Sequence, residues 1–341
     1  MSDLNTLSQQ LAEALQELKA LSERQIHFET ILLNKGLSTE DVGSFNPLLR
    51  RNFVSNADAA QQKHLMHTWK HNSPRVLEPS DLVESGFRAF SQNDEDGILL
   101  RLFTHIGCTN RYVIEIGSNC SDSDVGIPEN LSTNLLVNHG WHGTIFELDA
   151  TECSRMRYFF ARTASTRHYH WTREGETEYY SPKIVQQAIS PENINGLLMA
   201  NNPEPEPDLF IIDIDGGDFA VMENLRDIRP RVIVVEFEKR FRERHSVVQR
   251  DREQFNRRWQ QSGAASLTAW TTLLKPKGYE LCAVGTCCFN AFFVREDIAK
   301  GNLTALNPKE AFDSHPVFSA IDDAFWPVSY THLTLPTKRI V

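Results

Sequence analysis

The sequence predicts an α/β protein built on one doubly wound, mostly parallel sheet of seven strands that ends in an antiparallel hairpin. Short apolar segments alternate with helical segments over residues 87–300, the pattern of repeated strand–helix units. The segment DLFIIDIDGG (208–217) is apolar on both faces, as a central parallel strand requires. YELCAVG (279–285) and NAFFVRE (290–296) lie close together in the chain and predict the hairpin.

The strand–helix units can be placed in order along this segment. A helix is expected whose first turn holds the acidic run Asp94–Asp96, because these charges suit a helix amino terminus. A further helix is expected over 190–200, with Ser190 as its N-cap and Pro191 at its first position. The other expected strands are 112–117, 143–149, a weaker one at 166–170, and 231–238, and the other helices are 130–139, 153–161, 219–225 and 266–275.

Outside this domain, residues 1–35 predict a helix that self-associates as a coiled coil, so we expect a homo-oligomer. The alternative is that the helix lies on its own domain. Residues 36–86 are expected to be a linker with one helix, 301–328 a carboxyl-terminal extension, and 329–341 an artefactual tail. Consecutive a and d positions of the first helix hold Leu4, Leu7, Leu11, Ala14, Leu18, Leu21, Gln25, Phe28 and Leu32.

The helix in the linker, near residues 57–71, carries three histidines with helical spacing. His64, His67 and His71 can bind a metal on one helix face, or they are ordinary exposed side chains. The spacing alone does not decide between these two interpretations.

Composition excludes several classes of function. Of the 341 residues, 40% are hydrophobic, and the formal net charge is -10. This acidic balance repels phosphate backbones, so no nucleic-acid partner is expected. No apolar run approaches the ~18–20 residues of a membrane helix, and the first residues do not resemble a signal peptide. With no C-x-x-C pair among the six cysteines, we expect a cytoplasmic protein without a membrane span.

The first two strands end in residues that suit a nucleotide. Glu115, Gly117, Ser118 and Asn119 follow the first strand, where nucleotides bind in open α/β sheets, and Glu147 ends the second, where an acid can accept hydrogen bonds from ribose hydroxyls. The alternatives are that Glu115 caps a loop and that Glu147 is a solvated acid.

Three further acids gather at the ends of the fourth and fifth strands. Asp213 and Asp215 share one face because strand side chains alternate, and Glu236 ends the neighbouring strand. Such a group can supply a general base or hold a divalent cation, so the metal content stays unknown. Alternatively, Asp213 or Asp215 caps the following helix. Asn290 at the hairpin mouth can bind substrate, or it is an ordinary turn residue.

The kind of nucleotide follows from what the first loop contains. The G-x-G-x-x-G run that binds a pyrophosphate is absent, and Asp122 and Asp124 would repel one. An adenosyl ligand with a cationic sulfonium tolerates these acids, so a nicotinamide-dependent enzyme is disfavoured.

Several segments of residues 87–297 carry a resemblance to a known family. They include FSQNDEDGIL (90–99), YVIEIGSN (112–119), STNLLVNHGWHGTIFELD (132–149), DLFIIDIDGGDF (208–219), RVIVVEFE (231–238) and NAFFVR (290–295). Together, and in this order, they resemble the FkbM-like branch of class I methyltransferases.

The resemblance implies a Rossmann-like fold, S-adenosyl-L-methionine as cofactor, and O-methylation of a hydroxyl on a sugar or small polar metabolite. It places Glu115 and Gly117 at the cofactor's methionine end and Glu147 at its ribose. The rival hypothesis is a non-catalytic scaffold assembled through the coiled coil.

Overall fold

The structure, a computed structural model, describes most of the expected α/β domain. The chain divides into two units, Met1–Phe53 and Val54–Val341, and all described residues belong to the second. The predicted coiled coil, Asn119, the strand at 166–170 and the tail at 329–341 lie outside the described residues. Those described are 56–118, 120, 128–162, 171–173, 176–178, 182–201, 204–248, 264–287 and 289–315.

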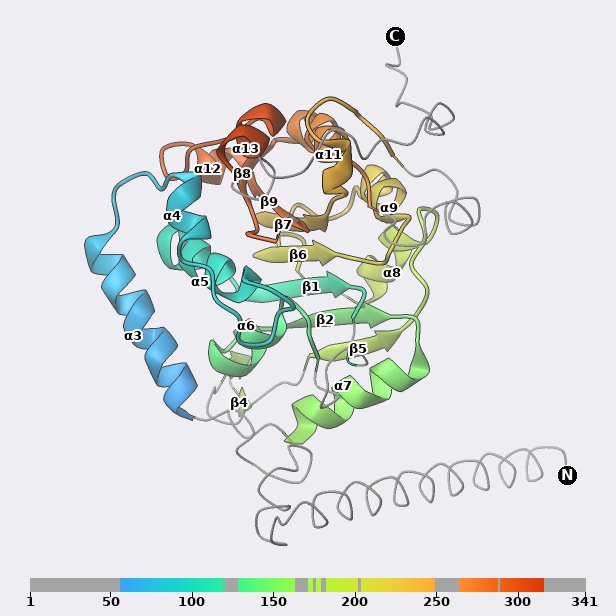
Figure 1. Ribbon diagram of the computed structural model, residues 1–341. Coiled ribbons are helices and arrows are strands. Elements are labelled where there is room, and N and C mark those ends of the chain that lie inside the picture. The colour runs from blue at the N-terminus through green and yellow to red at the C-terminus, as the bar shows by residue number, and fades with distance from the viewer. Residues whose placement is uncertain are drawn as a thin grey trace, which may run out of the picture. The chain divides into compact units, whose positions relative to one another are not determined.

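A seven-stranded mixed sheet forms the centre of this unit. Its strands are β1 (Tyr112–Ile116), β2 (His142–Glu147), β5 (Lys183–Gln186), β6 (Leu209–Ile212), β7 (Val232–Glu236), β8 (Tyr279–Val284) and β9 (Asn290–Arg295). They lie in the order β5-β2-β1-β6-β7-β9-β8 (Figure 1). The first five strands in this order are parallel, whereas β9 runs antiparallel to both of its neighbours, β7 and β8. The predicted sheet and its closing hairpin are therefore confirmed.

The edge strand β5 was not predicted from the sequence. It pairs with β2 from Thr144↔Lys183 to Glu147↔Gln186. Its four residues are only half-buried or exposed, so it lacks the apolar run that marks the inner strands. Two further short strands, β3 (Trp171–Arg173) and β4 (Glu176–Glu178), pair only with each other.

Helices cover both faces of the sheet. Ile114 and Ile116 of β1 share one buried cluster with residues of α8, α9, α11 and α13. Because strand side chains alternate, Val113 and Glu115 face the opposite layer, where α5, α6 and α7 lie (Figure 1). The helices on these two faces are α5 (Glu95–Ile106), α6 (Thr133–Asn138), α7 (Ala150–Arg162), α8 (Ile194–Asn201), α9 (Asp218–Asn224), α11 (Leu267–Leu274) and α13 (Pro308–Ser314).

The packed unit extends beyond the expected boundaries of 87 and 300. The helices α3 (Asn56–Asn72) and α4 (Pro79–Val83) lie before residue 87 and belong to this unit. Helix α12 (Glu296–Ala299) directly follows β9. Leu77 is completely buried and forms a parallel bridge with Leu303. Phe312 of α13 belongs to the main buried cluster. Segments expected to be linker and extension therefore complete the core.

One helix start was predicted wrongly. Helix α8 begins at Ile194, and residues 191–193 form a turn, so the regular helix starts three residues later than predicted. Ser190 holds this turn, because its carbonyl accepts from the Ile194 N–H at 3.1 Å and its N–H donates to Asn193 Oδ1 at 2.8 Å. The N-cap of α11 does follow its sequence, since Ser266 Oγ accepts from the Ala269 N–H. Within the described part of the chain, every helix is too short or too polar to cross a bilayer.

Candidate active site

A cavity of about 950 Å³ opens at the carboxyl ends of the parallel strands. In the sheet, β1 lies between β2 and β6, so the strand order reverses its direction at β1. The carboxyl ends of β1 and β6 therefore form the topological switch point, where ligands bind in open α/β sheets. Residues after β1, β2, β5 and β6 line the cavity together with the ends of β7 and β9. Most of the predicted site residues line it, namely Glu115, Gly117, Ser118, Glu147, Asp213, Asp215, Glu236 and Asn290.

Gly117 directly follows β1 and lies against the backbone at the end of β6, where both line the cavity. Its φ is +90°, and a Cβ built there would lie 1.6 Å from the carbonyl oxygen of Asp213. The Gly117 N–H donates to the Phe146 carbonyl at 2.9 Å, while the Asp213 N–H donates to the Ile116 carbonyl at 2.9 Å. Because both the backbone angle and the close contact exclude a side chain, only glycine fits this turn.

Glu147 is held in place at the end of β2. Its Oε2 accepts a hydrogen bond from the Ser118 N–H at 2.9 Å, and its Oε1 accepts from the Asp149 N–H at 2.7 Å. Ser118 in turn donates from Oγ to Asn130 Oδ1 at 2.7 Å. Glu147 is therefore fixed rather than a freely solvated acid, and each carboxylate oxygen keeps a lone pair for a ligand hydroxyl.

Glu115 lies beneath the loop that precedes α6. Its side chain is 2% exposed, and its carboxylate accepts from the Leu131 N–H at 3.0 Å, from the Ser132 N–H at 3.4 Å and from Ser132 Oγ. Burial raises its pKa to about 7, although these hydrogen bonds oppose the shift. The structure thus shows the loop-holding role, and direct contact with a cofactor stays a prediction.

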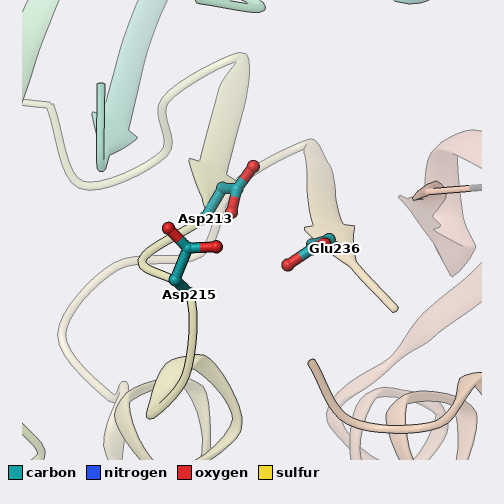
Figure 2. A group of neighbouring side chains, drawn as sticks. All are labelled: Asp213, Asp215 and Glu236. Carbon is teal, nitrogen blue, oxygen red and sulfur yellow. The ribbon is translucent and has the colours of Figure 1, made fainter. Parts of the chain in front are cut away.

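Three carboxylates form an acidic centre made of Asp213, Asp215 and Glu236. Each offers an oxygen, and these oxygens all lie within 4.8 Å of one another, with the side chains converging from the ends of β6 and β7 (Figure 2). Burial, and then repulsion by neighbouring acids, raises the pKa of both Asp213 and Glu236. Among the described residues, the buried Oε2 of Glu236 has no hydrogen-bond partner.

The turn after β6 aims Asp215 at this centre. Asp215, Gly216 and Gly217 have consecutive positive φ angles of 52°, 116° and 96°. Asp218 stabilises this turn, because its carboxylate accepts from the Ile214 N–H at 2.8 Å and from the Gly216 N–H at 3.0 Å. The N-cap of α9 is Gly217, with no side-chain cap, so the alternative that Asp213 or Asp215 caps this helix is wrong.

The sequence did not reveal how the acidic run at the start of α5 supports the cavity. The Glu95 carboxylate is 1% exposed and accepts from Asn290 Nδ2 at 2.9 Å. Asp96 accepts from three successive backbone N–H groups at 89–91, and Asp94 accepts from the Thr286 N–H. These acids therefore fasten the segment that carries Gln92 to the hairpin of β8 and β9.

Asn290 is consequently not an ordinary turn residue. It is the first residue of β9, only 7% exposed, and pairs in register with Glu236. Its amide nitrogen is occupied by Glu95, while the residue still lines the cavity.

Comparison with known proteins identifies the family. The sequence profile of the methyltransferase FkbM domain matches residues 102–281, more than half of the chain. The chain belongs to the FkbM methyltransferase family. No curated protein matches this methyltransferase significantly. A solved structure described as that of the pyocyanin biosynthetic protein PhzM is 10% identical in sequence and gives a TM-score of 0.30. The match covers 74% of this chain and 73% of the chain of that structure.

The charge of the methyltransferase cavity limits what it can hold. Eight carboxylates line it, whereas Arg155 is the only basic residue among the described lining residues. That guanidinium pairs with Glu152 at 2.7 Å. A lining of this charge disfavours a pyrophosphate and favours a ligand that carries positive charge.

Proposed function

We propose that this protein is an S-adenosylmethionine-dependent O-methyltransferase acting on a hydroxyl of a sugar or small polar metabolite. One observation carries the proposal: a single cavity joins the Gly117 turn, the fixed carboxylate of Glu147 and the acidic centre. The bound cofactor supplies an electrophilic methyl group on a cationic sulfur. The acceptor class, a small molecule or a glycan, rests on family membership.

The residues at the ends of β1 and β2 fit this cofactor. Gly117 leaves the backbone open to close approach, and Glu147 can accept hydrogen bonds from the two ribose hydroxyls through its remaining lone pairs. The acidic lining suits the sulfonium and disfavours a dinucleotide. Ser118 would contribute its backbone beside Glu147, and Glu115 would act through the loop it holds.

The acidic centre fits two roles in the transfer. Its carboxylate oxygens are the donors that Mg²⁺ or Ca²⁺ prefers, so Asp213, Asp215 and Glu236 would hold such a cation next to the acceptor hydroxyl. Without a cation, repulsion among the three favours one of them taking up a proton, and Asp213 would accept the hydroxyl proton as general base. In both cases the Asn290 carboxamide, fixed by Glu95, would orient the acceptor.

Calorimetric titration with S-adenosylmethionine and S-adenosylhomocysteine tests the cofactor. Glu147→Ala removes both ribose hydrogen bonds, so binding should weaken by on the order of 2–3 kcal/mol, since charge-assisted bonds are the stronger kind. Glu296→Ala is the matched control, because it removes the same charge from an exposed position on α12. It should bind like the parent.

Two outcomes would contradict the proposal. If the parent does not bind either ligand at millimolar concentration, the enzyme hypothesis fails and the scaffold hypothesis replaces it. If Glu147→Ala and Glu296→Ala bind equally well, the cofactor does not use the end of β2.

A further inference from the structure

Helix α3 carries two histidines whose rings face each other one turn apart. The Nε2 atoms of His67 and His71 are 3.1 Å from one another, and the ring centroids are 4.3 Å apart at an interplanar angle of 58°. Both side chains are exposed. The two imidazoles thus bring the same nitrogen together on the exposed face of the helix, within hydrogen-bond distance.

The packing of α3 does not require these histidines. The helix meets the rest of the unit through its other face, where Gln62 Oε1 accepts from Asn134 Nδ2 at 2.9 Å and the Trp69 ring lies 5.4 Å from the Arg101 guanidinium carbon. At 100° per residue, His67 and His71 point roughly away from Gln62 and Trp69. The described contacts of α3 with the rest of the unit therefore do not hold the two rings together. What links the rings is the contact of their Nε2 atoms, which a hydrogen bond or a shared metal ion can satisfy.

The separation of the nitrogens matches that of two ligands on one metal ion. Metal–imidazole bonds of about 2.0–2.1 Å at angles of roughly 90–110° place the two nitrogens about 2.9–3.4 Å apart. The observed 3.1 Å lies within this range. Two histidines at i and i+4 on one helix face are also the spacing with which helices bind zinc.

We propose that His67 and His71 form a two-histidine site for a divalent transition-metal ion of the Zn²⁺, Ni²⁺ and Cu²⁺ class. Imidazole nitrogen selects these ions, whereas the carboxylates of the acidic centre select Mg²⁺ or Ca²⁺, so the two sites differ in chemistry. In the described part of the chain, only the acidic centre gathers three or more metal-binding side chains. The helix site therefore has two protein ligands, and water completes the coordination.

Titration of the full chain with Zn²⁺, in the presence of excess Mg²⁺ to saturate the acidic centre, tests the proposal. Loss of one ligand converts a chelate into single-point binding, so His71→Ala should weaken Zn²⁺ binding by about 10²-fold or more. His64→Ala is the matched control, because His64 lies on the same exposed face and should leave the affinity unchanged. Since these positions are exposed, the circular dichroism of all variants should match that of the parent.

Electron paramagnetic resonance with one equivalent of Cu²⁺ provides a direct readout of the ligands. The parent should show hyperfine coupling to two imidazole nitrogens, and His71→Ala should lose one of them. Absence of Zn²⁺ binding by the parent at about 100 μM would overturn the proposal, since a chelate should be saturated there. An equal loss of affinity in His64→Ala and His71→Ala would also overturn the two-histidine site.

Discussion

The substitution Gly117→Ala should disrupt the junction between β1 and β6 more than the same change at any comparable glycine. The added Cβ would lie 1.6 Å from the Asp213 carbonyl oxygen, where real contacts essentially never fall below 3.0 Å. The two backbones must therefore move apart by more than an ångström. This movement stretches the hydrogen bond from the Asp213 N–H to the Ile116 carbonyl and displaces Asp213 from the acidic centre.

Gly278 provides a control that separates backbone strain from this contact. Its φ of +86° is close to the +90° of Gly117, but a Cβ there would have its nearest neighbour 4.0 Å away, at Arg229 Nη2. Left-handed backbone costs about 1–2 kcal/mol for a residue with a Cβ. Loss of glycine freedom in the unfolded chain offsets about 0.4–1 kcal/mol of this. Gly278→Ala should therefore lower the free energy of unfolding by at most about 1.6 kcal/mol.

Gly117→Ala has the same backbone contribution plus the effect of the contact. Overpacking adds about 1–3 kcal/mol, and loss of the strand-junction hydrogen bond adds about 0.5–1.5 kcal/mol. The total destabilisation should be about 1.5–6 kcal/mol, measured as a lower urea midpoint at unchanged slope. Calorimetry should also show weaker binding of S-adenosylhomocysteine by Gly117→Ala than by Gly278→Ala. Equal urea midpoints and equal affinities for the two variants would refute the reasoning.

Four further predictions address chemistry, positioning, pH and assembly. Asp213→Asn should leave cofactor binding nearly intact and cut methyl transfer on the order of 10²–10⁴-fold. A chelator should lower the parent's activity if a cation takes part. Equal activity of variant and parent would contradict both the general-base role and the cation-binding role of Asp213. Glu95→Ala frees the Asn290 amide, so methyl transfer should fall about 10–10²-fold with unchanged cofactor affinity; an unchanged KM for the acceptor would show that Glu95 does not position it. Burial raises the pKa of Glu115 from 4.5 to about 7, so the folded state binds this proton more tightly and the free energy of unfolding should fall as pH rises through that window. Urea midpoints should show a smaller decline in Glu115→Gln than in the parent, because burial also raises the pKa of Asp96 and Asp213; an equal decline in the two proteins would contradict the prediction. Light scattering should give the mass of an oligomer for the full chain and the mass of a monomer for a chain lacking residues 1–35. Monomer masses for both chains would assign the apolar seam to an intramolecular contact.

The inner sheet could be predicted because its strands are continuous apolar runs. Leu209–Ile212 is buried at every position, which is what a central parallel strand looks like in sequence. The edge strand Lys183–Gln186 has no such run, because its side chains are partly exposed, and nothing in its sequence distinguishes it from a loop. Burial against two layers therefore leaves a sequence signal that an edge position does not.

The acidic centre could be predicted for a similar reason. Asp213 and Asp215 follow one strand, and Glu236 ends its parallel neighbour, so parallel pairing places all three at one edge. Strand alternation was the wrong reason for Asp215, because β6 ends at Ile212 and a turn with positive φ angles aims this side chain. The contact between Glu95 and Asn290 could not be predicted, since these residues lie 195 positions apart in the chain. Glu95 also fits the amino terminus of a helix without any partner, which concealed its second role.

A crystal structure of the protein with S-adenosylhomocysteine and Mn²⁺ would test the central claim most directly. The account predicts the ribose hydroxyls of the ligand at the Glu147 carboxylate and its amino-acid portion beside Gly117. An anomalous peak between Asp213, Asp215 and Glu236 would assign the cation role, and a water there would assign the general-base role. Ligand density elsewhere, or none in this cavity at saturating concentration, would contradict the account.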